Sequence, residues 1–257
     1  MDSDSDFVRG STALVTGASR GIGAATADAL AREGAARVLI HYGGYREGAE
    51  KTLAAVRGHG ADGELLQADL ETDDGIRAFA DHLHARAHRI DVLVNNAGSM
   101  LRRAKLAEYT EDLYDRVMNL NVKSVLFITQ AIAPYMIERG RGAIVNVSSI
   151  SARTGGGPGS MIYSAAKAAI STLTKGLAKE LAPHGVRVNA VSPGTVDNHF
   201  HEQFSSRETL ENVRQSTPAR TLGTNEEVAD VIAFLCSEGA RFIHGQTIEV
   251  NGGTFMI

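Results

Sequence analysis

The sequence predicts an α/β domain in which a seven-stranded parallel sheet is doubly wound, with helices on both faces. Short runs rich in β-branched residues alternate with longer segments of helical period from one end of the chain to the other. A glycine-rich turn follows the first run and leads directly into a helical segment. No linker, internal repeat or change of composition divides the 257 residues. We therefore expect a single domain that spans residues 1–257.

The expected strands are short runs of four or five residues in which apolar side chains recur. They span residues 13–16, 36–40, 64–67, 92–95, 143–147, 187–191 and 247–250. Between them, apolar residues recur with the helical period, and Asp, Thr or Asn stands at several starting positions as a cap. The expected helices span residues 22–32, 46–57, 73–88, 111–138, 163–181 and 225–236.

Two segments fit neither pattern. Residues 154–160 are rich in glycine, and residues 198–219 form a polar stretch between a strand and the last helix. Loops of this length in a compact domain are commonly lids or binding loops. We expect residues 198–219 to form a lid.

The overall composition excludes several classes of partner. The formal net charge is −4 and the pI is about 6.1, so no global basic field draws the chain to nucleic acid or to anionic membranes. Charges or glycines interrupt every hydrophobic stretch, so no membrane span is expected. Cys236 is the single cysteine, and the first six residues are acidic, unlike a signal peptide. These features predict a cytoplasmic protein without nucleic-acid or membrane partners.

The glycine-rich turn after the first strand is typical of a phosphate-binding site. It reads Thr16-Gly-Ala-Ser-Arg-Gly-Ile-Gly23. Glycines let the backbone approach a pyrophosphate, and the helix N-terminus offers free N–H groups. A tight turn also needs glycine for structural reasons alone, and the spacing differs from G-x-G-x-x-G. Because the turn lies between the first expected strand and a helical segment, it predicts a Rossmann-type domain that binds a dinucleotide. The expected contacts are Gly17, Ser19, Arg20, Gly21, Ile22 and Gly23.

The end of the second strand indicates which dinucleotide is preferred. Domains that prefer NAD usually carry Asp or Glu there, to hold the ribose 2′-hydroxyl, but this strand ends Ile40-His-Tyr-Gly-Gly44. The missing acid, with Arg20 and Arg46 nearby, favours NADP(H), because an acid would repel a 2′-phosphate. Tyr42 is expected beside the cofactor. NAD(H) stays an alternative, since both arginines could simply be solvated surface residues.

Tyr163 and Lys167 stand four residues apart at the start of an expected helix, which places both side chains on one face. A phenol with the ordinary pKa of about 10 is a poor acid–base group at neutral pH. A neighbouring ammonium, a helix N-terminus and an oxidised nicotinamide all favour the phenolate. For these two residues alone, a chance pairing on a helix face is the alternative.

Five motifs together resemble the short-chain dehydrogenase/reductase family, in the family's order and approximate spacing. They are Thr16 to Gly23, Asn95-Asn96-Ala97-Gly98, the serines ending Val145 to Ser149, Tyr163-x-x-x-Lys167 and Ser192-Pro193-Gly194. The resemblance covers nearly the whole chain. It implies an NAD(P)(H)-dependent enzyme that moves a hydride between a nicotinamide and a carbonyl or alcohol carbon.

The resemblance also implies a catalytic set. Tyr163 is expected to be the general acid in ketone reduction and the base in alcohol oxidation, and Lys167 to lower its pKa and hold the nicotinamide ribose. Ser149 is expected to hydrogen-bond the substrate oxygen, and Asn121 to hold a water in a proton relay to Lys167. Ser151 is a minor alternative to Ser149, because the family serine usually lies about one residue nearer to the tyrosine.

Further cofactor contacts follow from the same resemblance. Asp69 matches the position that bonds the adenine amino group. The other expected contacts are Leu70, Asn96, Ala97, Gly98, Pro193, Gly194, Thr195 and Val196. Asn198 stands where the family often has a threonine that touches the cofactor amide, and Thr195 could compensate for it.

NADPH-dependent reduction of a ketone to a secondary alcohol is the favoured function, on a small-molecule or carrier-bound substrate such as a 3-oxoacyl thioester. A sugar or polyol dehydrogenase is the alternative. A non-catalytic NADP-binding regulator is less favoured, because it would not require the intact Asn, Ser, Tyr and Lys set. The family resemblance suggests a homotetramer, with the helices from residues 111 and 163 pairing across an interface. No metal is expected, because His82, His84, His88, His199 and His201 lack a convincing ligand set.

Overall fold

The computed structural model describes residues 7–84 and 87–257. The acidic first six residues, and residues 85–86 of the helix expected at 73–88, lie outside the described part. Within it, seven strands form one parallel sheet in the order β3-β2-β1-β4-β5-β6-β7. The strands are β1 Thr12–Val15, β2 Arg37–Tyr42, β3 Asp62–Gln67, β4 Val92–Asn95, β5 Gly142–Val147, β6 Val186–Pro193 and β7 Thr247–Val250. The predicted fold class is confirmed.

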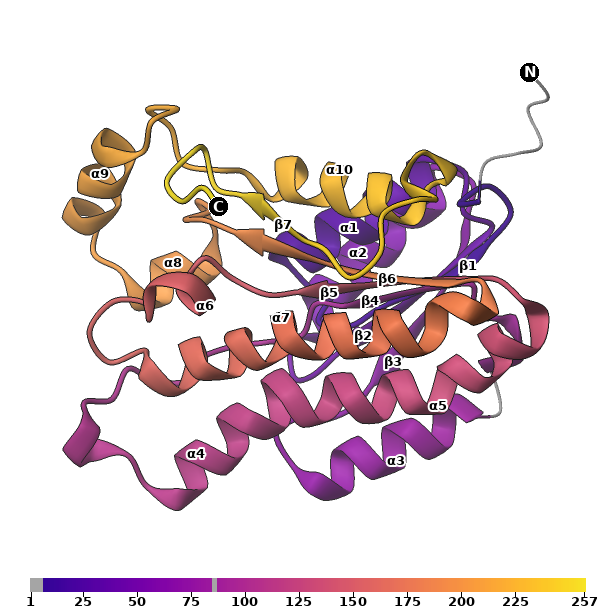
Figure 1. The fold of residues 1–257 in the computed structure, drawn as a ribbon, viewed down its shortest axis with the longest axis horizontal. Coiled ribbons are helices and arrows are strands. Elements are labelled where there is room, and N and C mark those ends of the chain that lie inside the picture. Colours follow the sequence, from indigo (N-terminus) through magenta and orange to yellow (C-terminus); the bar gives the residue numbers. More distant parts are fainter. Residues whose placement is uncertain (1–6, 85–86) are drawn as a thin grey trace.

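Helices cover both faces of this sheet (Figure 1). On one face lie α1 Gly21–Arg32, α2 Arg46–Gly58 and α10 Asn225–Cys236, and on the other α3 Asp73–His84, α5 Ser124–Arg139 and α7 Met161–Leu181. The other α-helices of the described residues are α4 Glu111–Met118, α6 Ser151–Thr154, α8 His199–Phe204 and α9 Arg207–Ser216.

Side-chain alternation along the strands builds the two cores. In β1, Ala13 and Val15 are buried in the cluster beneath α1 and α10, whereas Leu14 is buried in the cluster on the opposite face. In β4, Leu93 lies on the same side as Leu14. A strand buried on both faces needs apolar residues at every position, and this explains the continuous apolar runs in the sequence.

The helix expected at residues 111–138 is interrupted. A π-helical turn, Asn119–Lys123, separates α4 from α5. Such turns insert an extra residue into an α-helix and occur frequently at functional sites. The apolar period continues across the turn, so the sequence pattern carried no signal of the interruption.

The polar stretch 198–219 also differs from the expected loop, because it contains α8 and α9. Asn198 caps α8 by accepting from the Phe200 N–H, and Ser206 caps α9 by accepting from the Thr209 N–H. Both caps are visible in the sequence, but α8 is only six residues long and α9 buries only Leu210, so few apolar residues mark either helix.

By length and composition alone, one helical stretch in the described residues, Glu111–Arg139, is long and apolar enough to cross a membrane. Half of its most apolar window is buried inside the protein, as in a core helix of a globular domain. Its buried residues include Ile128, Ile132 and Met136, which pack in the core beside α3. The apolar character of this stretch is explained by its place in the core.

Candidate active site

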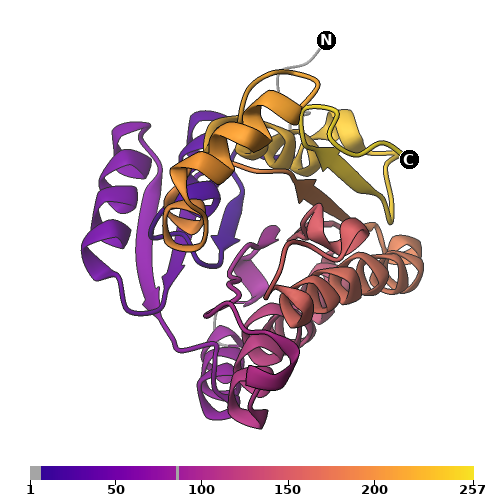
Figure 2. The same cartoon turned by 90° about the vertical axis from the view of Figure 1, so that its left-hand side faces the viewer.

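A cavity of about 650 Å³ opens at the carboxyl ends of the strands, where the strand order reverses between β1 and β4. Figure 2 faces this end of the molecule, and α8 and α9 lie across it. The wall of the cavity includes the glycine turn after β1, the loops after β4, β5 and β6, and residues of α7, α8 and α9. Most of the expected cofactor and catalytic residues therefore face a single space.

The glycine turn is held tightly against the loop after β4. Gly17 has φ +64°, and a Cβ there would lie 2.8 Å from the Cα of Ala97. The Asn96 side chain donates to the carbonyls of Thr16 and Gly17, at 2.9 and 3.0 Å. No side chain caps the N-terminus of α1 in the described part of the chain. Its first N–H groups are thus free to bind an anion, such as a pyrophosphate.

His41, which the sequence analysis did not single out, supports this turn from β2. Its Nδ1 accepts a hydrogen bond from the Gly17 N–H at 3.1 Å, and its Nε2 lies 3.2 Å from the carbonyl oxygen of Ala68. Burial lowers the pKa of His41 to about 4. The ring is therefore neutral at pH 7, with its proton on Nε2. A histidine that follows the apolar run Val38-Leu39-Ile40, two residues before a glycine pair, was the available signal.

The two arginines expected near the adenosine ribose have different surroundings. Arg20 lines the cavity, and its guanidinium carbon lies 4.9 Å from the centroid of the Tyr45 ring. Arg46 pairs with Glu50, with 2.9 Å between Nε and Oε1, and it is not among the described residues that line the cavity. Arg20 is thus the better placed of the two to meet a phosphate.

Most of the other expected cofactor contacts also line the cavity. They are Ser19, Gly21, Ile22, Asp69, Leu70, Asn96, Ala97, Gly98, Pro193, Gly194, Thr195 and Val196.

Two expected cofactor contacts do not line the cavity as far as the described residues define it. Tyr42 is 2% exposed, and its hydroxyl donates to Gln67 Oε1 at 3.3 Å. Gly23 packs inside the turn, where a Cβ would lie 2.4 Å from both Asn96 Nδ2 and the Gly17 carbonyl oxygen. Gly23 therefore shapes the turn from within, and Tyr42 belongs to the packing between β2 and β3.

Tyr163 and Lys167 project from the first turns of α7 into the cavity, beside Ser149 at the end of β5. Tyr163 is hydrogen-bonded to Ser149. The Lys167 Nζ donates to the Val147 carbonyl oxygen at 2.8 Å and lies 5.6 Å from the centroid of the Tyr163 ring. The structure therefore brings these three expected residues together.

Burial is the main cause of the pKa shifts of Tyr163 and Lys167. It raises the pKa of Tyr163 to about 12, with the Ser149 hydrogen bond acting in the opposite direction. Burial also lowers the pKa of Lys167 to about 8. The sequence-based expectation of a lowered tyrosine pKa is thus not met in the protein without cofactor, because desolvation of the phenolate exceeds the stabilisation that its surroundings provide.

Asn121 lies within the π-helical turn and is fully buried behind the cavity wall. Its Nδ2 donates to the carbonyls of Ser99 and Val117, at 2.7 and 2.8 Å, while its Oδ1 has no partner in the described structure. A Cβ on Gly98 would lie 2.7 Å from both Asn121 Oδ1 and Lys167 Nζ. Gly98 therefore keeps open the space between the asparagine oxygen and the lysine ammonium.

Of the two candidate serines, Ser149 is the one bonded to Tyr163. Ser151 begins α6 and donates to Ser149 through both its N–H and its hydroxyl, at 3.1 and 3.0 Å. Asn198 caps α8, and its Nδ2 donates to Asn225 Oδ1 at 2.9 Å. In this structure, Asn198 thus joins α8 to the start of α10.

Several residues of the cavity wall were not predicted individually as part of the site, although four of them lie within the expected lid at 198–219. Phe200 of α8 packs its ring 5.7 Å from that of Tyr163, between centroids. The others that face this end include Ser99, Met100, Arg103, His201, Leu210 and Val213. They come from segments that carry no recurring motif, so only the chain path shows that they meet.

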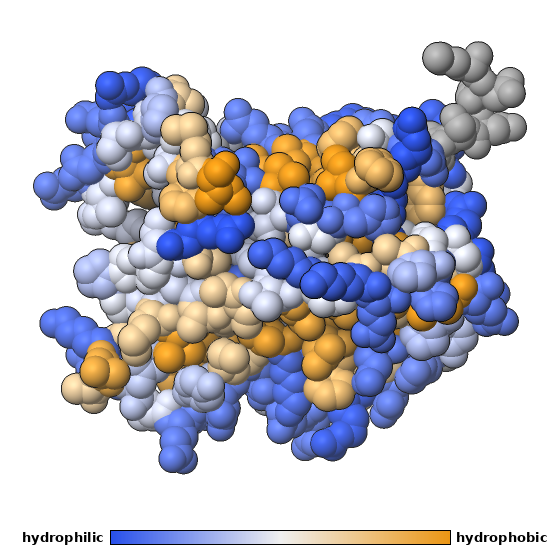
Figure 3. Space-filling model, viewed as in Figure 1, coloured by the Kyte–Doolittle hydropathy of each residue, from blue (hydrophilic) through white to orange (hydrophobic). Residues whose placement is uncertain are grey.

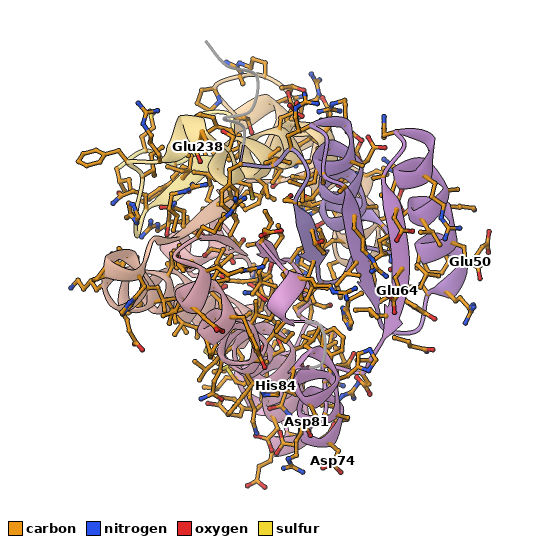
Figure 4. The ribbon with its side chains drawn as sticks, turned by 90° about the vertical axis from the view of Figure 1, so that its right-hand side faces the viewer. Glu50, Glu64, Asp74, Asp81, His84 and Glu238 are labelled. Carbon is orange, nitrogen blue, oxygen red and sulfur yellow. The ribbon has the colours of Figure 1, made fainter. Side chains whose placement is uncertain are left out.

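The histidines do not assemble into a metal centre in the described part of the structure. No group of three His, Cys, Asp or Glu side chains is positioned to hold an ion among the residues searched. His84 lies near Asp81 on the exposed side of α3 (Figure 4). The side chain of His88 lies outside the described residues.

Residues 17–254 match the profile of a family described as Enoyl-(Acyl carrier protein) reductase. The 3-oxoacyl-[acyl-carrier-protein] reductase FabG of Staphylococcus aureus is 39% identical over 245 residues, which cover 95% of this chain and 98% of that protein.

Solved structures agree with these sequence relatives. A short chain dehydrogenase/reductase family protein is 36% identical, with a TM-score of 0.84 and coverage of 97% of this chain and 99% of that one. The gluconate 5-dehydrogenase of Burkholderia cenocepacia, solved with NADP and tartrate, is 33% identical, with a TM-score of 0.85 and coverage of 96% and 95%.

Proposed function

Because this chain belongs to the short-chain dehydrogenase/reductase family, we propose that it is an NADP(H)-dependent oxidoreductase that interconverts a ketone and a secondary alcohol. The observation that carries the proposal is the hydrogen-bonded Tyr163 and Ser149 pair, beside Lys167 and at one end of the cavity that the glycine turn also lines. This arrangement joins a proton donor to a dinucleotide-sized space.

The cofactor site fits the group. The tight approach of Gly17 to Ala97 leaves no space for a side chain at the turn, and the uncapped start of α1 is suited to the pyrophosphate. Arg20 would meet the 2′-phosphate, Asp69 the adenine, and Lys167 the nicotinamide ribose. The bound nicotinamide supplies or accepts the hydride.

The protein's own groups handle the proton and the developing charge. In ketone reduction, Tyr163 gives its phenolic proton to the substrate oxygen while Ser149 donates a hydrogen bond to the same oxygen. Positioned acid catalysis of this kind contributes roughly 10² to 10⁴ in rate. The two donors form a small oxyanion site, which is suited to the charge that grows on the oxygen.

Reprotonation of Tyr163 is assigned to Lys167 and Asn121. The unpartnered Oδ1 of Asn121 and the gap at Gly98 provide a place for a water molecule that would contact the Lys167 ammonium. A neutral protein side chain would hold that water, so the relay would run without placing a second charge in the core. This role rests on the geometry of the π-helical turn.

Support for NADP(H) over NAD(H) comes from Arg20 and from the missing acid at the end of β2. Gly43 and Arg20 both line the cavity, and a Cβ on Gly44 would contact nothing within 4 Å, so there is room for a phosphate. The gluconate 5-dehydrogenase of Burkholderia cenocepacia was solved with NADP, in agreement with this preference.

Two substrate classes have support. Sequence relatives such as the Staphylococcus aureus reductase favour a 3-oxoacyl thioester, whereas the Burkholderia cenocepacia structure favours a sugar acid. A non-catalytic regulator is disfavoured, because a protein that only senses NADP(H) would not require the Ser149, Tyr163, Lys167 and Asn121 arrangement.

The segment 198–219 is proposed as the substrate lid, since α8 brings Phe200 against Tyr163.

We also propose a cytoplasmic homotetramer without nucleic-acid or membrane partners. Apolar residues gather over α5, α7 and α10 on one side of the molecule (Figure 3). Large exposed apolar side chains include Leu126, Phe127, Met161, Phe234, Phe242, Met256 and Ile257. A patch of this kind is suited to a subunit interface. Light scattering that gives a monomer would contradict the tetramer.

The test is NADPH oxidation at pH 7, with NADH in parallel, against an acetoacetyl thioester, a diketone and several keto sugars. Turnover with NADPH on any of these ketones is expected. Preferential use of NADH would overturn the assignment of Arg20. Tight NADPH binding without turnover across the panel would favour the regulator and contradict the enzyme.

A further inference from the structure

Arg103 joins three segments that border the substrate end of the cavity. It lies in the loop after β4 and lines the cavity. Its Nε donates to the Phe204 carbonyl oxygen at the end of α8, at 2.8 Å, and one terminal nitrogen donates to the Pro158 carbonyl oxygen, also at 2.8 Å. The guanidinium therefore sits between α8 and the glycine-rich segment that leads into α7.

These two bonds leave part of the guanidinium available. Arg has five N–H donors, and the contacts to Phe204 and Pro158 use two of them. Among the described residues, no carboxylate forms an ion pair with Arg103. The positive charge thus faces the cavity without a counter-ion from the chain.

His201 is a second polar group at the substrate end of the cavity. It lines the same cavity, and its Nδ1 lies 3.2 Å from the Ser205 hydroxyl. Burial, followed by the positive charge of Arg103, lowers the pKa of His201 to about 4, against the opposing effect of the Asp197 carboxylate. At neutral pH the ring is uncharged, and its Nε2 is available to a ligand.

The acidic residues of the cavity wall lie elsewhere. Asp69 and Glu71 follow β3, at the edge of the sheet, whereas Ser149 follows β5. Four strand spacings separate β3 from β5, which is about 19 Å at ~4.8 Å per spacing. Asp197, whose negative charge acts on His201, is not among the described residues of the cavity wall, and its Oδ1 lies 4.0 Å from Arg207 Nη1. With respect to the wall residues, an anionic substrate group near Ser149 and Arg103 would therefore meet a positive charge with little repulsion.

We propose that Arg103 binds a carboxylate of the substrate, assisted by His201, so that the physiological substrate is a hydroxy or oxo acid with its carboxylate several carbons from the reacting carbonyl. This inference rests on the proposed oxidoreductase function. The planar guanidinium is suited to a carboxylate, because it can donate two parallel hydrogen bonds. A 3-oxoacyl thioester has no charge close to its ketone and would leave this cation unpaired.

The distance between the carboxylate site and the reacting carbonyl follows from the position of α8. Phe200 packs against Tyr163, and Arg103 contacts the carbonyl of Phe204, one helical turn further along. One turn of helix rises about 5.4 Å. The carboxylate site is thus displaced from the reacting centre by a distance that several carbon atoms can span.

The experiment compares two ligands that differ only in the proposed contact. D-gluconate and D-glucitol share their hydroxyl pattern, but glucitol has a neutral CH₂OH in place of the carboxylate. Their binding to the NADPH-loaded protein, where no hydride acceptor is present, is measured by calorimetry for the wild type, Arg103→Gln and Arg102→Gln. Arg102 is the matched control, because it donates to the Glu108 carbonyl oxygen and is not among the described residues of the cavity wall.

We expect gluconate to bind the wild type at least tenfold more tightly than glucitol. Arg103→Gln should weaken gluconate binding roughly 10- to 100-fold, the usual range for a charge-assisted hydrogen-bonded pair, and leave glucitol binding unchanged. Arg102→Gln should change neither. Arg103→Lys, which keeps the charge but loses the bidentate geometry, should give an intermediate loss.

Three results would overturn the inference. They are equal binding of gluconate and glucitol to the wild type, no saturable binding of gluconate, and an equal loss of both ligands in Arg103→Gln. The last result would mean that Arg103 only holds α8 in place.

Reduction of 5-keto-D-gluconate and L-sorbose, which differ in the same group, separates this inference from the proposed function. Turnover of both at equal kcat/KM overturns the carboxylate site alone. Arg103-dependent binding of gluconate without turnover of any ketone contradicts the enzyme and leaves the carboxylate site standing. Faster turnover of a neutral acetoacetyl thioester, unaffected by Arg103→Gln, would assign the pocket to acyl chains.

Discussion

The Nζ atom of Lys167 lies 5.6 Å from the centre of the Tyr163 ring and donates its hydrogen bond to the carbonyl oxygen of Val147, while the phenol is bonded to Ser149. The lysine is therefore anchored to β5 beside the tyrosine. Because burial raises the pKa of Tyr163 to about 12, the phenol keeps its proton at neutral pH. It is consequently in the form that a ketone reductase requires.

Tyr163→Phe removes this proton donor and keeps the ring. We expect kcat for ketone reduction to fall by roughly 10² to 10⁴, because acid catalysis is lost, while the NADPH dissociation constant changes little. Stopped-flow turnover and fluorescence titration of NADPH measure the two effects. Tyr114→Phe, on the exposed surface of α4, is the control. Undiminished turnover in Tyr163→Phe would remove the tyrosine from the mechanism.

Asn121→Ala tests the proton relay. The substitution leaves the carbonyls of Ser99 and Val117 without their donor, which should cost about 1 to 3 kcal/mol of unfolding free energy. We also expect kcat to fall more than tenfold, with a larger solvent isotope effect, because water no longer links Lys167 to the interior.

Asn119→Ala is the matched variant for the relay, because it lies in the same π-helical turn but bonds the Glu71 carbonyl oxygen. It should lower the free energy of unfolding without changing the isotope effect. If both variants lose kcat in proportion to their loss of stability, the relay assignment is incorrect.

Arg20→Gln tests the choice of dinucleotide. An arginine–phosphate contact is charge-assisted, so its loss should lower kcat/KM for NADPH roughly 10- to 100-fold. The value for NADH should stay within a factor of about two, since NADH has no 2′-phosphate. Arg46→Gln should have a much smaller effect, because Arg46 is paired with Glu50. An equal loss for both cofactors would assign Arg20 to the turn itself.

His41 should make the protein sensitive to acid. Its folded-state pKa is about 4, below the ordinary value of 6.5, so the unfolded chain binds the proton more readily. The stability that neutral His41 provides is therefore present above pH 6.5 and is lost as the pH falls toward 4. Between pH 7 and 4.5 this single group should cost about 2 kcal/mol.

Urea unfolding at the two pH values measures that loss, and His41→Gln should reduce it. His59→Gln is the control, because His59 lies at the surface beside Asp28. His201, with its pKa also lowered to about 4, adds to the total in both variants and does not affect the comparison. The same acid sensitivity in wild type and His41→Gln would contradict this account.

Local patterns predicted much of the fold. The strands 92–95 and 247–250 and the helix 225–236 have the predicted bounds. Thr224 and Glu227 form a capping box at the start of that helix, a signal contained within four residues. The prediction was wrong where the local pattern carried no signal of the structure. The π-helical turn at 119–123 keeps the apolar period, and α8 and α9 are short and mostly exposed.

The spacing of Tyr163 and Lys167 could be translated into a shared helix face, because backbone geometry alone sets which residues of a helix are neighbours. The strand pattern likewise determined the parallel sheet, since residues buried on both faces leave a continuous apolar run. The meeting of Arg103 with Phe204, or of His41 with Gly17, depends instead on strand order and on loop paths between distant segments. The direction of the Tyr163 pKa shift also required the tertiary structure, because desolvation is the sum of everything that packs around the phenol.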